Sequence, residues 1–225
     1  MVCKGAGAGI LKDIDKMEML TREMVKRTKL PVTVKTRLGW DEKSIKIVEV
    51  AERIQDAGAK AITIHGRTRA QMYKGFADWA PIAEVKNNPR MNIPVFGNGD
   101  VNSPEKAIEM RDRYGLDGAM IGRASIGNPW FFNHVKHYFK TAEHLPYPMI
   151  NERIDMARRH LEMSIKWKGE KLGVLETRRH YSNYFKGIPD FKKHRTIMVT
   201  TDHSDELFAL FNELKKEFSP QPVFS

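Results

Sequence analysis

The sequence predicts an α/β fold in which parallel strands alternate with helices, followed by a helical C-terminal region. Three observations lead to this prediction. Four short apolar runs recur along the first two thirds of the chain, helical patterns separate them, and further helical patterns follow a segment that contains Pro146 and Pro148. Strands that alternate with helices at this spacing are typical of βα units around a parallel sheet.

The predicted elements follow in a regular order. Helices are expected over residues 10–28, 44–59, 78–88 and 103–115, and the apolar runs between and after them cover residues 30–40, 60–69, 93–100 and 116–125. Ile45, Val48, Ala51 and Ile54 share one face of the second helix, and Gly58 is its expected C-cap. Ser103 is expected to cap the fourth helix. The runs read as apolar on both faces, as in a parallel sheet that is covered on both sides.

Polar residues stand at the carboxyl end of each apolar run. They are Lys35 and Arg37, His65 and Arg67, Asn98 and Asp100, and Arg123. In a (β/α)8 barrel these ends surround one mouth, where the chemistry takes place. An open doubly wound sheet is the alternative, although no GxGxxG motif opens the first unit. Four units make only half of a barrel.

The glycines at the last two strand ends favour a phosphorylated ligand. The sequences GNGD, residues 97–100, and IGR, residues 121–123, allow backbone N–H groups to approach a phosphate, and Arg123 can bind it in a bidentate way. Each residue also has a structural interpretation: a strand-end lysine, a hydrogen-bonded histidine, or a tight turn. Four such signals at successive strand ends point jointly to a phosphorylated ligand in the mouth.

Composition and charge limit the functional classes. The chain has 225 residues, 41% of them hydrophobic, and carries 38 basic against 28 acidic residues, a formal net charge of +10. The apolar content argues against global disorder. No apolar run is long enough for a membrane span, and no secretory signal is visible, so we expect a cytoplasmic protein without a membrane partner. The positive charge favours a polyanionic partner, most often nucleic acid, over a merely basic soluble protein.

Neither the cysteine nor the histidines indicate a reactive or metal site. Cys3 is the only cysteine, which excludes an internal disulfide and fits a reducing cytosol. It stands beside a small-residue run at the expected start of a helix and is interpreted as a bystander. His134 and His137 lie three residues apart on a helical pattern without an acidic or cysteine partner in step, so no metal site is expected.

The C-terminal region is predicted to be a separate helical domain, with the boundary between residues 145 and 146. Helices are expected over residues 151–168 with Asn151 as N-cap, over 170–187, and over 204–218 with Ser204 as N-cap. Basic residues and tyrosines are interleaved in the second of these helices. Arg178, Arg179, His180 and Lys186 suit phosphate contacts, and Tyr181 and Tyr184 suit base stacking. The alternative is a solvated basic face with both tyrosines in the helical core.

Several segments together resemble one family, the tRNA-dihydrouridine synthases, most closely the bacterial B-type branch. The matching segments are GAGAGIL, PVTVKTRLGW, AITIHGRTRAQMYKG, IPVFGNGDV, DGAMIGRASIGNPWFF and, more loosely, TRRHYSNYFKGIP. The resemblance implies an FMN-dependent (β/α)8 TIM barrel, of which residues 1–145 are strands five to eight, and a small all-α tRNA-binding domain over residues 146–225. It also implies that NADPH reduces the flavin, that the reduced flavin delivers hydride to C6 of a uridine in tRNA, and that a cysteine protonates C5.

The resemblance also implies roles for individual residues. Lys35 and His65 resemble contacts to the flavin ring. Asn98, Gly99, Asp100, Gly122 and Arg123 resemble contacts to the FMN phosphate and ribitol. Arg67 and Arg69 lie in a basic loop that faces RNA in the family. No stable protein partner is implied.

The chain departs from the family pattern at its start. The family's N-x-G-C-P motif, which holds the acid cysteine, is expected upstream of Met1, so no catalytic residue is assigned within the chain. We expect the chain alone to bind FMN weakly or not at all and to be inactive. Two alternatives remain: a non-catalytic RNA-binding remnant of such an enzyme, and another FMN barrel oxidoreductase that acts on a small molecule, against which the basic C-terminal domain argues.

Overall fold

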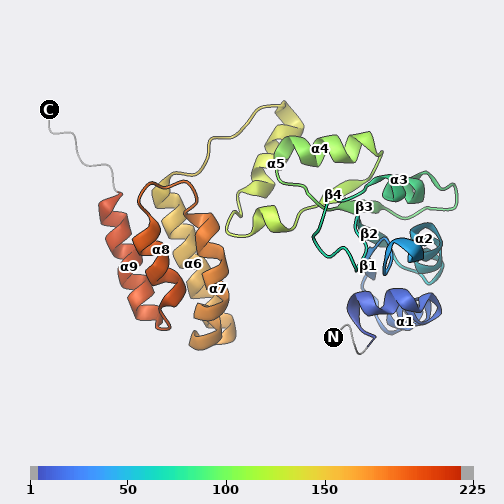
Figure 1. Ribbon diagram of the computed structural model, residues 1–225, viewed down its shortest axis with the longest axis horizontal. Coiled ribbons are helices and arrows are strands. Elements are labelled where there is room, and N and C mark those ends of the chain that lie inside the picture. The colour runs from blue at the N-terminus through green and yellow to red at the C-terminus, as the bar shows by residue number, and fades with distance from the viewer. Residues whose placement is uncertain (1–4, 219–225) are drawn as a thin grey trace. The chain divides into compact units, whose positions relative to one another are not determined.

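The computed structural model describes residues 5–218, which fall into two compact units (Figure 1). The sheet unit comprises Met1–Ala124 and Tyr138–Ala142, and the helical unit comprises Ser125–His137 and Glu143–Ser225. The sequence placed the boundary between residues 145 and 146, whereas this division assigns residues 125–137 to the helical unit. Cys3 lies outside the described residues, and the interpretation of it as a bystander stays a prediction.

The sheet unit is built on four parallel strands in the order of the sequence. The strands are β1 (Thr33–Arg37), β2 (Ala61–His65), β3 (Val95–Asn98) and β4 (Gly118–Met120). Each lies within one of the four predicted apolar runs, and consecutive strands pair in parallel. The predicted α/β class with a parallel sheet is therefore confirmed.

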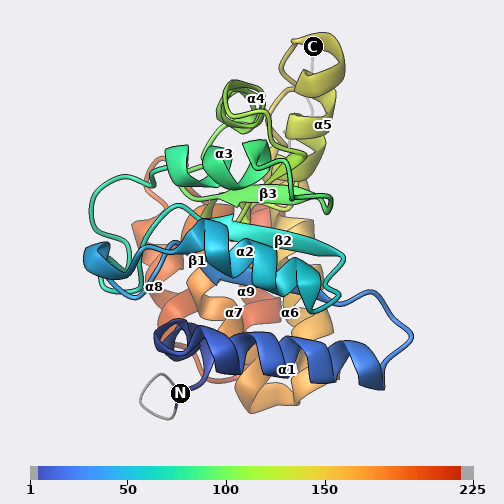
Figure 2. The same cartoon turned by 90° about the vertical axis from the view of Figure 1, so that its right-hand side faces the viewer.

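The helices that precede and connect the strands lie along one side of this sheet (Figure 2). They are α1 (Ile14–Arg27), α2 (Ile47–Asp56), α3 (Ala80–Asn87) and α4 (Pro104–Arg113). Because α1 contacts α2 and α2 contacts α3, these helices share a face. On this side Ile62, Ile64 and Val95 are fully buried. The opposite side carries polar strand residues, including Lys35 and His65, so the expectation of two apolar faces was wrong.

Capping groups determine where two of these helices begin. The predicted helix over residues 10–28 is divided into the 3-10 helix η2 (Gly7–Lys12) and α1. The division falls at Asp13, whose side chain accepts a hydrogen bond from the amide of Lys16 at 2.9 Å and so starts a new helix. Ser103 caps α4 as predicted, accepting from the amide of Lys106 at 3.2 Å.

The apolar face of α2 differs from the predicted one. A short 3-10 helix, η3 (Glu42–Ser44), precedes α2, and Ile45 lies between them, 41% exposed. Ile47 and Val50 are buried instead, beside Ala51 and Ile54. The chain leaves α2 through Gly58 at φ 99°, directly after the C-cap Ala57, which agrees with the predicted end.

The helical unit contains α6 (Ile150–Lys168), α7 (Glu170–Tyr184), α8 (Lys192–Thr200) and α9 (Ser204–Glu217), and α5 (Phe131–Thr141) spans the division between the units. Helix α8 was not predicted. Asn151 and Ser204 lie inside the first turns of their helices, which Met149 and His203 precede as caps. Helix α7 ends before the predicted Gly187.

The helical unit has an apolar core of its own. Its fully buried members include Ile154, Leu161, Val174, Tyr181 and Phe211. Within residues 5–218 no helix is both long and apolar enough to span a membrane.

Candidate functional site

The strand register brings the predicted site residues to one edge of the sheet. Arg37 pairs with His65, His65 with Asn98, and Asn98 with Met120, all at the carboxyl ends of their strands. Residues that are paired in register point to the same face of a sheet. These residues point to the face of the sheet that the helices do not cover. We call this row at the carboxyl ends of the strands the polar sheet margin.

Arg67 and Asp100 form an ion pair beside this row. The Nη2 atom of Arg67 lies 2.8 and 3.0 Å from the two carboxylate oxygens of Asp100, and the arginine is only 2% exposed. Arg67 also donates to the carbonyl oxygen of Gly75 at 2.6 Å. This burial contradicts the expectation that Arg67 faces RNA, because its donors are taken up inside the protein.

The carboxylate of Asp100 holds its neighbours in place. It accepts hydrogen bonds from the amide of Ala77 at 2.7 Å and from Arg123 at 3.0 Å, in addition to Arg67. Burial raises the pKa of Asp100, but the hydrogen bonds from Ala77 and Arg67 outweigh it, and the net pKa lies below the usual value. A carboxylate bound to two arginines is a poor phosphate contact. We therefore interpret Asp100 as the residue that orients Arg123.

Arg123 is an accessible cation of this edge. Its side chain is 58% exposed, and its guanidinium lies 4.8 Å from the centroid of the Tyr73 ring. Nearby, a Cβ atom on Gly122 would meet no atom within 4 Å, whereas one on Gly99 would lie 2.5 Å from Cβ of Ala77. Gly99 also has φ of 126°, a conformation that favours glycine. The Cβ position of Gly122 thus faces open space, whereas that of Gly99 is closed by Ala77.

The pKa values of His65 and Lys35 are both lowered. Burial, reinforced by Arg37, Lys35 and Arg67, lowers the pKa of His65 to about 4. Burial and Arg37 also lower the pKa of Lys35. Asn98 donates to the carbonyl oxygen of Met120 at 2.8 Å and fastens β3 to β4 at this edge.

Arg69 remains available in the loop after β2. Its guanidinium lies 5.1 Å from the centroid of the Trp40 ring, and the side chain is partly exposed. Of the two arginines predicted to face RNA in this loop, only Arg69 is accessible.

The predicted RNA-binding residues of α7 separate into buried and exposed groups. Arg178 donates to the carbonyl oxygen of Thr201 at 2.7 Å and to the Asp202 carboxylate at 2.6 Å, which ties it to the connection between α8 and α9. Tyr181 and Tyr184 are 0% and 3% exposed. They belong to the helical core, so the expectation that they stack on bases was wrong.

Arg179 and Lys186 are exposed. His180 lies between the two groups: its ring centroid is 4.5 Å from that of His160, and burial together with His160 lowers the pKa of His180 to about 4. Arg179 and Lys186 are therefore candidates for phosphate contacts, whereas His180 is neutral near pH 7.

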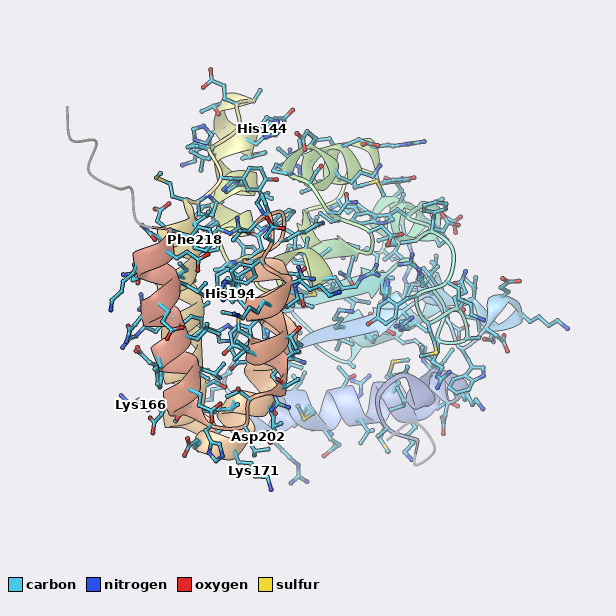
Figure 3. All side chains as sticks on the ribbon, turned by 60° about the vertical axis from the view of Figure 1, so that its left-hand side comes forward. His144, Lys166, Lys171, His194, Asp202 and Phe218 are labelled. Atoms are coloured by element: carbon cyan, nitrogen blue, oxygen red, sulfur yellow. The ribbon has the colours of Figure 1, made fainter. Side chains whose placement is uncertain are left out.

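An exposed surface at the junction of α6 and α7 was not predicted. Trp167, Met163 and Leu172 are 86%, 61% and 52% exposed. Lys166 and Lys171, at the same junction, lie at one end of the helical unit together with Asp202 (Figure 3). We call Met163, Lys166, Trp167, Lys171 and Leu172 the junction surface. The sequence carries a signal for it, because Trp167 stands between two lysines.

No group of three or more metal-ligating side chains that could hold an ion occurs within the part of the chain that the structure describes. Each unit therefore carries candidate residues of its own. In the sheet unit they are the polar sheet margin with Gly99 and Gly122, and in the helical unit they are the exposed cations.

Comparison with known proteins agrees with this arrangement. The family model described as dihydrouridine synthase matches residues 2–219. The chain belongs to the dihydrouridine synthase family. This confirms the resemblance drawn from the six sequence segments.

Two relatives of this dihydrouridine synthase chain are representative. "Probable tRNA-dihydrouridine synthase 1" of Synechocystis is 44% identical over 186 residues, which cover 83% of this chain and 52% of the relative. The tRNA-dihydrouridine synthase B of Pseudomonas putida is 38% identical over 195 residues, which cover 86% of this chain and 57% of the relative. The chain thus spans a little over half the length of these relatives.

Proposed function

We propose that the chain is part of a tRNA-dihydrouridine synthase, an FMN-dependent oxidoreductase that reduces a uridine in tRNA. In this proposal the sheet unit supplies strands five to eight of a (β/α)8 barrel, and the helical unit holds the tRNA. One observation carries it: Lys35, His65, Asn98 and Arg123 gather at a single sheet edge. The sequential strand order with helices on one side supports a barrel over a doubly wound sheet.

The residues at this edge fit FMN. A phosphate needs cations, and the exposed Arg123 supplies one beside Gly122, where no atom lies within 4 Å of the Cβ position. Asp100 is bound to Arg67 and Arg123, so its negative charge is compensated. The donor set of the edge therefore suits an anionic, hydrogen-bond-accepting cofactor.

Bound FMN would supply hydride transfer from NADPH to C6 of the uracil ring. The chain's own contribution is electrostatic and positional. Lys35 lies on the same face as His65, two residues before the row, and favours negative charge on a flavin ring placed there. Asn98 fixes the edge through Met120. The proton for C5 is assigned to the family cysteine expected upstream of Met1, in the reducing environment of the cytosol.

The coding sequence directly upstream of the Met1 codon tests the enzyme proposal. An in-frame segment that encodes the N-x-G-C-P motif is expected. The protein expressed with this segment should purify with a bound-FMN spectrum and restore dihydrouridine to the tRNA of a strain that lacks its synthases, as measured by mass spectrometry. An upstream region without such a frame contradicts the proposal and favours the RNA-binding remnant.

A pair of arginine variants tests the phosphate assignment in that protein. Arg123→Ala should weaken FMN binding about 10- to 100-fold, because a hydrogen bond to a charged group contributes roughly 1.5–3 kcal/mol. Arg113→Ala is the matched control, since Arg113 is an exposed arginine of α4 whose nearest carboxylate is Glu109. Equal FMN affinity in both variants would contradict the role of Arg123.

We further propose that tRNA contacts the helical unit at Arg179 of α7, at Lys186 after this helix, and at the junction surface. Arg69 is proposed separately as a contact of the sheet unit. Exposed aromatic rings among lysines suit a nucleic acid because cations bind phosphates while the ring stacks on a base. The exposure of Trp167, 86%, supports this assignment, since a side chain of that size is seldom left in water without a partner.

Gel-shift titrations of the chain with tRNA test this surface at several salt concentrations. Trp167→Ala should weaken binding about 5- to 100-fold, given roughly 1–3 kcal/mol for a stacked base. Arg179→Ala should reduce the slope of log K against log salt by about 0.7–0.9. Lys216→Ala on α9 is the control and should leave affinity nearly unchanged. If tRNA affinity and its salt dependence are the same in all three variants as in the unsubstituted chain, the assignment is refuted.

A further inference from the structure

A chain of hydrogen bonds at the sheet edge connects Asp100, Arg67 and His65. The Nη2 atom of Arg67 binds both carboxylate oxygens of Asp100, and its Nη1 atom lies 3.3 Å from Nε2 of His65. Arg67 and His65 are 2% and 6% exposed. These contacts are therefore shielded from water. In such surroundings a polar atom without a correctly oriented partner is costly.

The direction of the bond between Arg67 and His65 follows from chemistry. A guanidinium carries only N–H donors, so Nε2 of His65 must accept. A neutral imidazole that accepts through Nε2 holds its proton on Nδ1. A protonated imidazole would direct a second N–H at the guanidinium, which is unfavourable for both hydrogen bonding and charge.

The neighbouring residues hold this arrangement in place. Arg67 is fixed by the carbonyl oxygen of Gly75 at 2.6 Å as well as by Asp100. Gly99 closes the other side of the imidazole, because a Cβ atom there would lie 3.1 Å from Cδ2 of His65. A ring flip would turn a carbon toward Arg67 and forfeit the hydrogen bond.

The second nitrogen of His65 is left for a ligand. Among residues 5–218, none donates to or accepts from Nδ1 of His65. Nδ1 of His180 and of His194 are fully enclosed without a partner, whereas Nδ1 of His65 is not. It therefore reaches solvent.

We propose that Arg67 is a positioning residue that fixes His65 as the neutral tautomer with its proton on Nδ1, so that His65 presents one hydrogen-bond donor to an acceptor atom of the ligand. The acceptor class is a ring nitrogen or carbonyl oxygen of a heteroaromatic ring. The identification of this acceptor with the flavin rests on the proposed function. The assignment of the His65 tautomer does not depend on that function.

The charges around His65 act in the same direction. Lys35 and Arg37 of β1 and Arg67 of the following loop lower the pKa of His65. The carboxylate of Asp100 raises it. Tyr73 lies 6.4 Å away, between ring centroids. Since Asp100 is compensated by Arg67 and Arg123, the cations dominate, and a proton on both nitrogens is disfavoured near neutral pH.

Nitrogen NMR of the histidine rings tests this inference on the ¹⁵N-labelled chain. Two-bond ¹H–¹⁵N spectra distinguish a protonated from an unprotonated ring nitrogen, and His65→Asn assigns the signals. We expect Nδ1 protonated, Nε2 unprotonated, and no change from pH 8 to about pH 5. A His65 signal with the proton on Nε2, or a cationic ring at pH 7, would overturn the proposal without any variant.

A double variant and a single variant separate the effect of the hydrogen bond from that of the charge. Arg67→Met combined with Asp100→Asn removes the donor without leaving a buried carboxylate, and should give a mixed or Nε2–H tautomer. Lys35→Met removes a cation but keeps the bond, so the pKa of His65 should rise while the tautomer stays. An unchanged tautomer in the double variant would contradict the role of Arg67.

FMN distinguishes this inference from the proposed function. Added to the protein that includes the upstream segment, FMN should shift the Nδ1–H signal of His65. The predicted tautomer without a response to FMN would support the inference and contradict the flavin site.

Discussion

Gly97 and Gly122 both lack a side chain, but the space beside them differs. A Cβ atom on Gly97 would lie 2.0 Å from Cζ3 of Trp79, whose ring is buried and donates to the carbonyl oxygen of Gly99. Gly97→Ala should lower the free energy of unfolding by about 3 kcal/mol because the tryptophan must move. Gly122→Ala, with no atom near its Cβ position, should change it by less than about 0.5 kcal/mol. Urea unfolding of both variants measures the difference, and equal losses would contradict the packing argument.

Single residues also mark the limit of the sequence argument. The strand-end positions of Lys35, His65 and Asn98 followed from their places at the carboxyl ends of the apolar runs, and the register brings them to one edge. The burial of Arg67 did not follow, because nothing local distinguishes an arginine that faces solvent from one that binds a distant carboxylate. Its partner Asp100 lies thirty-three positions further along the chain.

At the scale of elements, Arg178 connects α7 to the end of α8. It donates to the last carbonyl oxygens of α8 and to Asp202, and its side chain is 23% exposed. Arg178→Ala should lower the stability of the helical unit by about 2 kcal/mol, because several hydrogen bonds of a charged group are lost. Arg179→Ala, an exposed neighbour, is the control for thermal unfolding and should leave the midpoint within about 2 °C. A midpoint that is the same in both variants would show that Arg178 has no structural role.

Helix α8 shows why some elements escaped prediction. Its sequence, KKHRTIMVT, contains β-branched threonine and valine and has only one fully buried apolar residue, Met198. Tertiary packing against α7, not local propensity, stabilises it. By contrast, α4 and α9 carry strong capping or amphipathic patterns and appear close to where they were expected.

At the scale of the whole molecule, the chain has two cores. Ile64 is fully buried beneath the helices of the sheet unit, and Leu161 is fully buried in the helical unit. Calorimetry of the intact chain should therefore resolve two transitions. Ile64→Ala and Leu161→Ala should each lower one transition by an amount equivalent to about 2–5 kcal/mol and spare the other. A single transition that both substitutions shift equally would contradict two separately stabilised units.

The sequential order of the four strands has a consequence for how the sheet forms. Within residues 5–218, β1 pairs with β2, β2 with β3 and β3 with β4, so each pair joins strands that are consecutive in the sequence. Loop closure between such neighbours costs little entropy, so the contacts of the sheet stay local along the chain. During synthesis each new βα unit meets an edge that is already formed, and the sheet can grow by accretion in the order in which the ribosome delivers it.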